Sequence, residues 1–253
     1  MKTISERMPG AKLISGDEIE TQYQVAFGRD SFWLDLPTGK DPAEVRLIFV
    51  FSGAGGAGGD NNLTRIGTAG KFRREMLSRG FGFVCAVCSP SAFGDLESTE
   101  ATLRASEYCR ACGMNVPDRI PLLGFSMGGL GALMFAARHP ERTARIADIF
   151  GITDLEHFYR EGKYPDILGK LTQEERSGRA PVRKAERYRD IPILIVHGDA
   201  DKIVDISHSE RLYDALERQE CPARFQVIPG YGHTNEILAA AGGYVKQFFE
   251  GTL

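Results

Sequence analysis

The feature that most constrains the fold is a regular alternation of short apolar runs with helix-like stretches from about residue 45 onward. The apolar runs are rich in β-branched and aromatic residues, which is typical of strands buried on both faces in a parallel sheet. Helical patterns between such strands indicate βαβ units. The expected strands are 45–51, 83–87, 120–125, 146–150, 193–197 and 224–228, and the expected helices are 71–78, 99–112, 128–138, 209–219 and 235–249.

The chain has 253 residues, a length at which α/β folds commonly form one domain, so we expect a single unit spanning 1–253. Residues 22–27 and 31–36 are expected to form an antiparallel hairpin at the sheet edge. Residues 154–190 interrupt the alternation with 37 residues that include nine Lys or Arg and eight Asp or Glu. This insertion is either a solvated helical excursion or a small cap over a cleft.

Charge and hydropathy exclude two classes of partner. Lys and Arg (31) nearly balance Asp and Glu (34), so we expect no nucleic-acid partner. The longest apolar runs have six residues, whereas a membrane span needs about 20, so we expect no membrane partner. No secretory signal is visible and the five cysteines are odd in number, which favours a cytoplasmic location. The sequence makes no prediction of oligomeric state.

A nucleophile motif lies at one of the expected strand-to-helix turns. Gly124-Phe125-Ser126-Met127-Gly128 matches G-x-S-x-G, between the strand 120–125 and the helix 128–138. Glycines flank the serine because a Cβ at either position would clash in so tight a turn. The turn exposes the serine hydroxyl beside a helix N-terminus, which favours developing negative charge.

A serine nucleophile needs a base that an acid orients, and both are expected downstream in the order acid, then histidine. Asp201 follows the strand 193–197, and His233 follows the strand 224–228. Each lies just beyond the carboxyl end of a strand, where open parallel sheets form their active sites. Asp199 and Asp205 are neighbouring alternatives for the acid.

These motifs resemble the α/β-hydrolase family over nearly the whole chain, from 45 to 249. In that family, H-G-x-x-D-x-x-V, which begins here at His197, carries the acid at its Asp, here Asp201. A G-H dipeptide after the last strand carries the base, here His233. The resemblance implies a mostly parallel sheet with helices on both faces and a Ser126–His233–Asp201 triad. It also implies a structural role for His197.

A glycine-rich segment follows the strand 45–51, and seven of the chain's 29 glycines lie between residues 53 and 70. Gly53, Gly55 and Gly58 satisfy the dinucleotide fingerprint G-x-G-x-x-G, but no helix follows directly and the next strand ends without an acid for a ribose hydroxyl. A Tyr159-x-x-x-Lys163 match to short-chain dehydrogenases lacks that family's upstream serine. We therefore interpret the segment differently.

In the hydrolase interpretation this loop supplies part of an oxyanion hole, in which backbone N–H groups stabilise the charge that develops on the carbonyl oxygen. One donor is expected from Met127, the residue after the nucleophile. The other is expected from Ala54 or Gly53. The family often has His-Gly-x-Gly here, and Ser52 replaces the histidine, which leaves the anchoring of the loop open.

Two C-x-x-C pairs, Cys85 with Cys88 and Cys109 with Cys112, are separated by 20 residues, within the range of zinc ribbons. The first pair lies at a buried strand, where residues three apart point to opposite faces. The second pair lies on a helix. We therefore interpret the cysteines as small buried side chains rather than metal ligands.

The sequence thus predicts a serine hydrolase of the α/β-hydrolase fold that requires no cofactor and no metal. The resemblance to dienelactone-hydrolase and prolyl-oligopeptidase-like branches suggests a small-molecule ester substrate with a small acyl, aryl or sugar group. Phe158 and Tyr159, in an aromatic cluster with Tyr164, are the expected substrate contacts from the insertion. A serine peptidase is the nearest alternative, although we expect no propeller or other gating domain. A non-catalytic ligand-binding relative is the other alternative.

Overall fold

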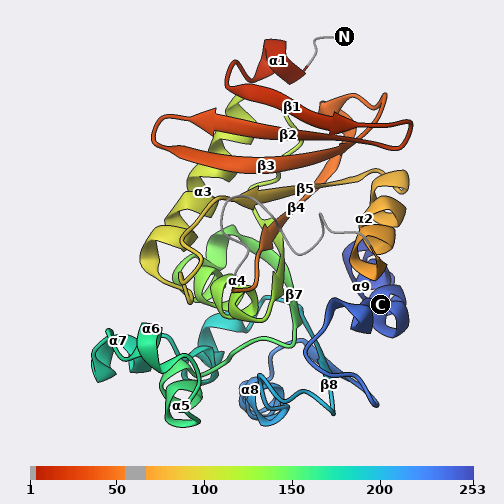
Figure 1. Ribbon diagram of the computed structural model, residues 1–253. Helices are drawn as coiled ribbons and strands as arrows, with labels where there is room; N and C mark the ends of the chain where they lie inside the picture. The colour runs from red at the N-terminus through yellow and green to blue at the C-terminus, as the bar shows by residue number, and fades with distance from the viewer. Residues whose placement is uncertain (1–3, 55–66) are drawn as a thin grey trace.

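The computed structural model describes residues 4–54 and 67–253, and its centre is a nine-stranded sheet in the order β1-β2-β3-β5-β4-β6-β7-β8-β9 (Figure 1). Three N-terminal strands pair antiparallel, and β3 pairs antiparallel with β5; the remaining pairs are parallel. The strands are β1 (Ala11–Gly16), β2 (Glu20–Phe27), β3 (Asp30–Pro37), β4 (Arg46–Phe51), β5 (Phe81–Ala86), β6 (Ile120–Phe125), β7 (Thr143–Ile149), β8 (Ile193–Gly198) and β9 (Ala223–Ile228).

Helices cover both faces of the sheet. The longer ones are α2 (Thr68–Ser78), α3 (Leu96–Ala111), α4 (Met127–Arg138), α8 (Ser207–Arg218) and α9 (Leu238–Glu250). Helices α3, α4 and α8 contribute to the apolar core on one face, and α2 and α9 contribute to the core on the other. In Figure 1, α2 and α9 lie together on one side of the sheet and α3 and α4 on the other. The predicted α/β-hydrolase fold is confirmed.

The central strands are apolar along their whole length because they bury both faces. In β6, Leu122 belongs to the core beneath α3 and α4, whereas its neighbour Leu123 belongs to the core beneath α2 and α9. Ile193 and Leu194 divide in the same way in β8. Since successive side chains of a strand point to opposite faces, continuous apolar runs are required here.

Two elements differ from the sequence-based expectation. The expected hairpin gains a third strand, β1, whose side chains are mostly exposed, so that it shows no apolar alternation. The expected helix 235–249 begins with a 3₁₀ turn at Asn235–Ile237 that Thr234 caps, and α9 continues from Leu238.

The charged insertion folds into three short helices, α5 (Leu155–Arg160), α6 (Pro165–Leu168) and α7 (Gln173–Gly178), followed by two 3₁₀ turns. Several of its charges pair with each other. Glu156 is buried and accepts hydrogen bonds from Arg160 at 2.8 Å and Arg176 at 2.7 Å. Figure 1 shows these helices beyond α4, at the carboxyl end of the central strands. The insertion is therefore placed where a cap over the site would lie.

Helix α4 approaches strand β4 so closely that only glycine fits at its second residue. A Cβ at Gly128 would lie 2.0 Å from the carbonyl oxygen of Phe51. We expect Gly128→Ala to lower the free energy of unfolding by about 3 kcal/mol or more, because the two backbones must separate. Urea unfolding followed by circular dichroism measures this change.

Gly243→Ala is the matched control, because Gly243 lies exposed in α9 with no atom within 4 Å of the added Cβ. We expect this substitution to raise the free energy of unfolding by about 0.5–1 kcal/mol, since alanine loses less backbone entropy than glycine. Equal effects of the two substitutions would contradict the steric role of Gly128.

Candidate active site

The site is built around the turn between β6 and α4. Ser126 occupies this turn with φ of 56° and ψ of −120°, a conformation that is unfavourable for a residue with a side chain. Its N–H donates to the carbonyl of Ile149 at 3.0 Å, and its carbonyl accepts from the N–H of Gly129 at 2.9 Å. A Cβ at Gly124 would lie 2.4 Å from the carbonyl oxygen of Gly128. The predicted glycine requirement on both sides of the serine thus has a steric cause in the structure.

The structure brings Ser126, His233 and Asp201 together in one hydrogen-bonded chain. The Nε2 atom of His233 lies 2.8 Å from Ser126 Oγ, and its Nδ1 atom lies 2.7 Å from Asp201 Oδ2. An ionised carboxylate can only accept, so Nδ1 carries the proton and Nε2 is free to accept the serine proton. This is the arrangement that a general base needs in order to activate a hydroxyl nucleophile.

Asp201 is held by several donors at once. Its Oδ1 accepts from the N–H groups of Ile203 at 2.8 Å and Val204 at 3.0 Å. Its Oδ2 accepts from His233 and lies 3.3 Å from Nε2 of His197. Burial by itself raises the pKa of Asp201, but the hydrogen bonds from His197 and His233 outweigh it and hold the pKa well below its ordinary value. The carboxylate therefore stays ionised beside the histidine.

The two alternative acids lie elsewhere. Asp199 accepts from the N–H of Gly230 at 2.6 Å, and Asp205 accepts from the N–H of Ser207 at 3.0 Å. His197 is fully buried, with Nδ1 2.7 Å from the hydroxyl of Ser209. It contacts the acid rather than the serine, in agreement with the structural role that the resemblance implies.

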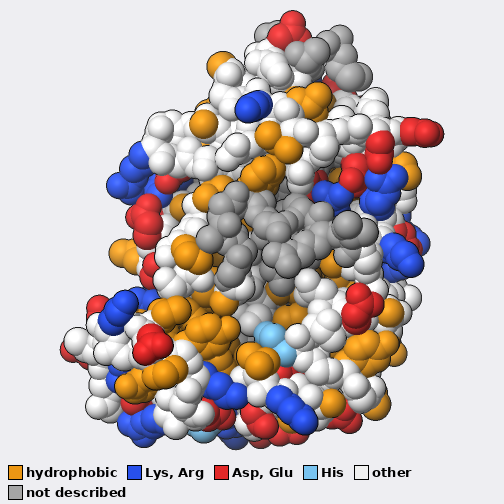
Figure 2. Space-filling view, viewed as in Figure 1, with side chains coloured by type: hydrophobic (Ala, Val, Ile, Leu, Met, Phe, Trp, Pro, Cys, Tyr) orange, Lys and Arg blue, Asp and Glu red, His pale blue; other side chains and the backbone are white. Residues whose placement is uncertain are grey.

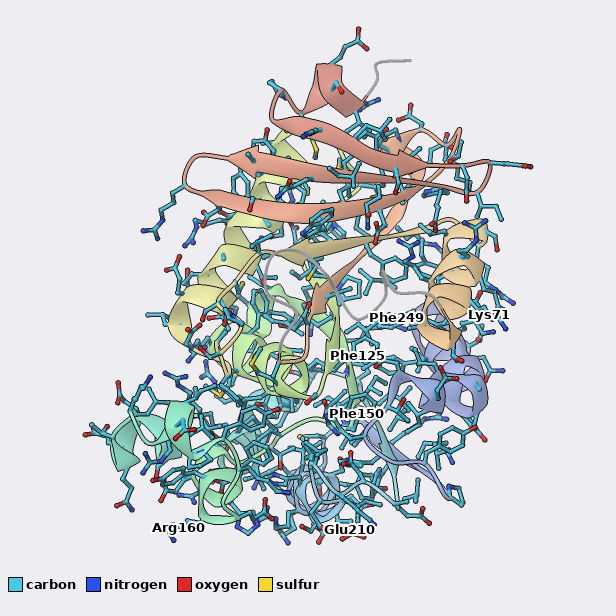
Figure 3. The ribbon with its side chains drawn as sticks, viewed as in Figure 1. Lys71, Phe125, Phe150, Arg160, Glu210 and Phe249 are labelled. Carbon is cyan, nitrogen blue, oxygen red and sulfur yellow. The ribbon has the colours of Figure 1, made fainter. Side chains whose placement is uncertain are left out.

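A pocket opens in front of the serine, and its lining includes both expected loop donors. The lining residues are Gly53, Ala54, Ser126, Phe150, Tyr164, His233, Thr234 and Asn235. The space-filling view shows a histidine beside hydrophobic side chains in the lower half of this face (Figure 2). Figure 3 places Phe125 and Phe150 at this end of the sheet, above the lower helices. The ring of Phe150 packs against that of His233 with centroids 4.6 Å apart.

The predicted oxyanion donors remain a prediction, but their positions agree with it. Met127 is the first residue of α4, so its N–H lacks an acceptor one helical turn back. Ser52, which replaces the family's histidine, lies with its hydroxyl 3.3 Å from the thiol of Cys85 in β5 and so ties the start of the loop to the sheet. Burial raises the pKa of Cys85 to about 11, so this thiol stays neutral. Gly55 and Gly58 lie outside the described residues.

The expected substrate contacts from the insertion are corrected. Phe158 is 1% exposed and packs in an apolar cluster with Leu155 and Leu168, and it does not line the pocket. Tyr159 lies under the guanidinium of Arg176, 4.0 Å from the ring centroid. Both aromatic rings hold the insertion together. Tyr164 is the residue of the insertion that lines the pocket.

Sequence reasoning missed Phe150, Thr234 and Asn235 as pocket residues, and it gave Tyr164 only a supporting role. Phe150 directly follows β7, and Thr234 directly follows the base. Position after a strand end is therefore the signal for Phe150. For Thr234 and Asn235 the signal is their place next to the expected base, His233. Tyr164 has a left-handed backbone with φ of 48°, which no pattern in the sequence indicates.

Serine, histidine and aspartate in this geometry, on this fold, define a serine hydrolase of the α/β-hydrolase class. Residues 98–247 match the model of the prolyl oligopeptidase family, Peptidase_S9. The match covers more than half of the chain, and the chain belongs to this family.

Three known proteins illustrate the breadth of its relatives. The uncharacterized protein YfhR of Escherichia coli (strain K12) is 29% identical over 228 residues, which are 83% of this chain and 76% of YfhR. A puromycin-hydrolyzing peptidase of Mycobacterium tuberculosis superposes with a TM-score of 0.71 at 21% identity over 92% of this chain, but this chain spans only 39% of that peptidase. A truncated carbohydrate esterase from gut microbiota superposes with a TM-score of 0.74 at 20% identity over 95% of this chain and 99% of the esterase. The two structural likenesses establish the fold.

No helix in the described parts of the chain is long and apolar enough to cross a membrane.

A buried acid lies directly behind the serine turn. Asp148 in β7 is fully buried, and neither carboxyl oxygen has a hydrogen-bond partner among the described residues. A Cβ at Gly129 or at Gly151 would lie 2.0 Å from its Oδ1, so the acid explains both glycines. Burial raises the pKa of Asp148 to about 7, and nearby His197 opposes this shift only in part.

This acid makes a testable contribution to stability. Between its ordinary pKa and about 7, folded Asp148 keeps a proton that the unfolded chain releases, so the stability of the wild type falls as pH rises. Asparagine does not titrate. We expect the stability of Asp148→Asn relative to the wild type to increase by roughly 3 kcal/mol between pH 4 and pH 7.

Urea unfolding of both proteins at several pH values in this range measures the difference between their free energies of unfolding. Titrating groups that both proteins share contribute equally to the two values and cancel in this difference. A difference that stays constant with pH would contradict the buried, proton-holding state of Asp148.

Proposed function

We propose that this chain hydrolyses carboxylic esters with small acyl, aryl or sugar groups through an acyl-enzyme intermediate on Ser126. The observation that carries the proposal is the hydrogen-bonded chain from Ser126 Oγ through His233 to Asp201, which ends at an open pocket. An intact chain of this kind speaks against a ligand-binding relative without activity.

In the proposed mechanism, Ser126 Oγ attacks the ester carbonyl while His233 Nε2 takes the hydroxyl proton. Asp201 holds the imidazole in the required tautomer and stabilises its cation. The backbone N–H of Met127, with that of Ala54 or Gly53, would donate to the oxyanion. His233 then gives the proton to the departing alkoxide, and water, activated by the same histidine, hydrolyses the acyl-enzyme.

The pocket's chemistry favours a neutral ester over a peptide held by its terminus. An exopeptidase must recognise a free amino or carboxyl group, for which an opposite charge is the strongest partner. No Asp, Glu, Lys or Arg occurs among the described residues that line the pocket in front of Ser126. Tyr164 and Phe150 instead provide aromatic surface on which an acyl or aryl group can pack.

A second pocket supports a small acyl group. It shares Gly53 with the pocket in front of Ser126, and its lining also includes Met127, Phe93, Ala92 and Cys88. These side chains are apolar, and Phe93 is buried. A short acyl chain placed near the expected oxyanion donors can extend into this space.

A serine peptidase is the second candidate, because the family includes the prolyl oligopeptidases and because one of the solved relatives is a puromycin-hydrolyzing peptidase. The same triad would serve amide cleavage, with His233 protonating the leaving amine. Substrate panels separate the two activities.

Reaction with a fluorophosphonate probe tests the nucleophile. We expect the wild type to be labelled and Ser126→Ala to remain unlabelled, because the probe phosphonylates an activated serine hydroxyl. Hydrolysis of p-nitrophenyl esters of increasing acyl length should fall by about 10⁴-fold or more in Ser126→Ala. Ser78→Ala on α2, whose exposed hydroxyl bonds the carbonyl of Glu75, should keep both labelling and activity.

An unlabelled wild type would contradict the serine mechanism. Labelling together with cleavage of aminoacyl p-nitroanilides, and without ester hydrolysis, would replace the esterase proposal by the peptidase.

Tyr164 tests the role of the insertion in substrate binding. Its ring packs edge-on against Phe93, with centroids 5.6 Å apart, and it lines the pocket. We expect Tyr164→Ala to raise KM for phenyl-containing esters about fivefold, which is the loss of about 1 kcal/mol of ring contact, while ethyl acetate is affected less. Tyr164→Phe keeps the ring and should retain the wild-type KM. Equal KM values in all three proteins would contradict a contact between the insertion and the substrate.

A further inference from the structure

Three metal-binding side chains meet between the insertion and helix α8, outside the pocket that contains Ser126. His157 and Glu161 lie one helical turn apart on α5 and at its C-terminal cap, and His208 lies in the first turn of α8. One ligand atom from each lies within 4.8 Å of the other two. Among the residues that the structure describes, these three are the His, Cys, Asp or Glu side chains whose ligand atoms lie this close together in a group of three. In Figure 1, α5 and α8 are adjacent at the lower end of the molecule, and Arg160 of α5 and Glu210 of α8 mark them in Figure 3.

The distances in this cluster approach those of tetrahedral coordination. Zinc bonds of about 2.0–2.1 Å to nitrogen and oxygen place neighbouring ligand atoms roughly 3.3 Å apart. His157 Nε2 lies 3.1 Å from Glu161 Oε1, and His208 Nε2 lies 3.3 Å from Glu161 Oε2. The two imidazoles thus contact different oxygens of one carboxylate, and one ligand atom from each residue lies within 4.8 Å of the other two. Binding of one ion requires rotation of the His157 and Glu161 side chains, both of which are partly exposed.

The surroundings of His208 suit a ligand. Its ring is fully buried and packs edge-on against the ring of Phe158. The Nδ1 atom accepts from the N–H of Thr153 at 3.3 Å, so the metal-free ring carries its proton on Nε2, facing Glu161. An ion bound at Nε2 would displace that proton to Nδ1. The hydroxyl of Thr153, 3.4 Å away, can then accept it, because this hydroxyl donates its own proton to the His208 carbonyl at 2.7 Å. A second acceptor of this kind orients a metal-bound histidine.

The donor set selects the kind of ion. Two imidazole nitrogens and one carboxylate suit zinc and its neighbours in the transition series, whereas calcium and magnesium require mostly oxygen ligands. Two further charges act on this cluster from α8 and the loop before it. The carboxylate of Asp205 favours positive charge at His208, whereas the guanidinium of Arg211 disfavours it. The effects of these two residues on a bound cation therefore oppose each other.

We propose that His157, Glu161 and His208 form a binding site for one Zn²⁺ ion, with water as the fourth ligand. The ion would fasten α5 to α8 and so fix the insertion on the hydrolase core. This role is structural. It differs from the sequence-based expectation of no metal, in which His157 and His208 have exposed or packing roles.

The position of the site gives this fastening a consequence. Glu161 precedes the pocket residue Tyr164 by three positions. His208 precedes Ser209, whose hydroxyl bonds His197 beside the triad acid Asp201. A bound ion would therefore fix the position of Tyr164 in the pocket wall relative to the Ser209–His197 contact beside Asp201.

Titration of the metal-free protein with ZnCl₂ tests the proposal. We treat the full chain with a chelator, remove the chelator and measure binding by calorimetry. One ion per chain is expected, together with a rise in Tm on adding Zn²⁺, because an ion that binds only the folded state stabilises it. Co²⁺ in its place should give the intense visible absorption of a tetrahedral complex.

His157→Ala and Glu161→Gln should each weaken Zn²⁺ binding more than about tenfold and abolish the rise in Tm. Both side chains are partly exposed, so these variants keep the core intact, which circular dichroism checks without metal. His139→Ala is the matched control. That ring also pairs with a carboxylate, Glu100, at 2.9 Å, but no second histidine is nearby in the described cluster, so its Zn²⁺ affinity should equal that of the wild type.

The proposal is overturned if the wild type binds no stoichiometric Zn²⁺, if binding survives both ligand substitutions, or if His139→Ala loses it to the same degree. None of these outcomes depends on the ester or peptide activity of Ser126.

Discussion

The close contact between the backbone of helix α4 and the end of strand β4 is the constraint on which the rest of the site depends. Gly128 has no side chain, so the helix can start directly over the carbonyl of Phe51. The chain can therefore reverse within one residue, Ser126, at a positive φ. Ser126 is fixed at the carboxyl edge of the sheet as a result. Its hydroxyl then points away from the core, beside the first N–H groups of α4.

Parallel pairing of β6, β7, β8 and β9 supplies the other parts of the site at the same edge. The loops after β8 and β9 carry Asp201 and His233, and the residue after β7 is Phe150, which packs on the histidine ring. Asp201 is distinguished from Asp199 and Asp205 by its hydrogen bonds rather than by its position along the chain. Two backbone N–H groups and two histidines converge on its carboxylate, which keeps it charged although it is buried.

Most of the fold was predictable because the central strands bury both faces and the strand-to-helix turn has strict steric needs. Strand β1 was not, because its exposed side chains follow no apolar period. The three residues of the candidate site, Ser126, Asp201 and His233, could be predicted because each lies in a motif that follows a strand. The wrong assignment of Phe158 and Tyr159 has a different origin. Short helices joined by irregular turns give no periodicity that separates an inward from an outward ring. Here Phe158 packs inside an apolar cluster, and the partly buried Tyr159 lies under the guanidinium of Arg176.

The buried Asp148 shows how the core and the site are linked. Its side chain occupies the space that Gly129 and Gly151 leave, one layer behind the serine turn. Gly129, the residue directly after the G-x-S-x-G motif, therefore meets a packing need that is separate from the conformation of the turn. Such a need is invisible without the neighbouring strand, because Asp148 is distant from the motif in sequence.

The central proposal is that Ser126 carries the acyl group during turnover, and rapid-quench mass spectrometry of the peptide that contains Ser126 tests it most directly. During hydrolysis of a slowly deacylating p-nitrophenyl ester, this peptide should gain the mass of the acyl group, with a burst of p-nitrophenol of about one equivalent. Continued ester hydrolysis with no acylated Ser126, or with the acyl group on another residue, would contradict the proposed mechanism.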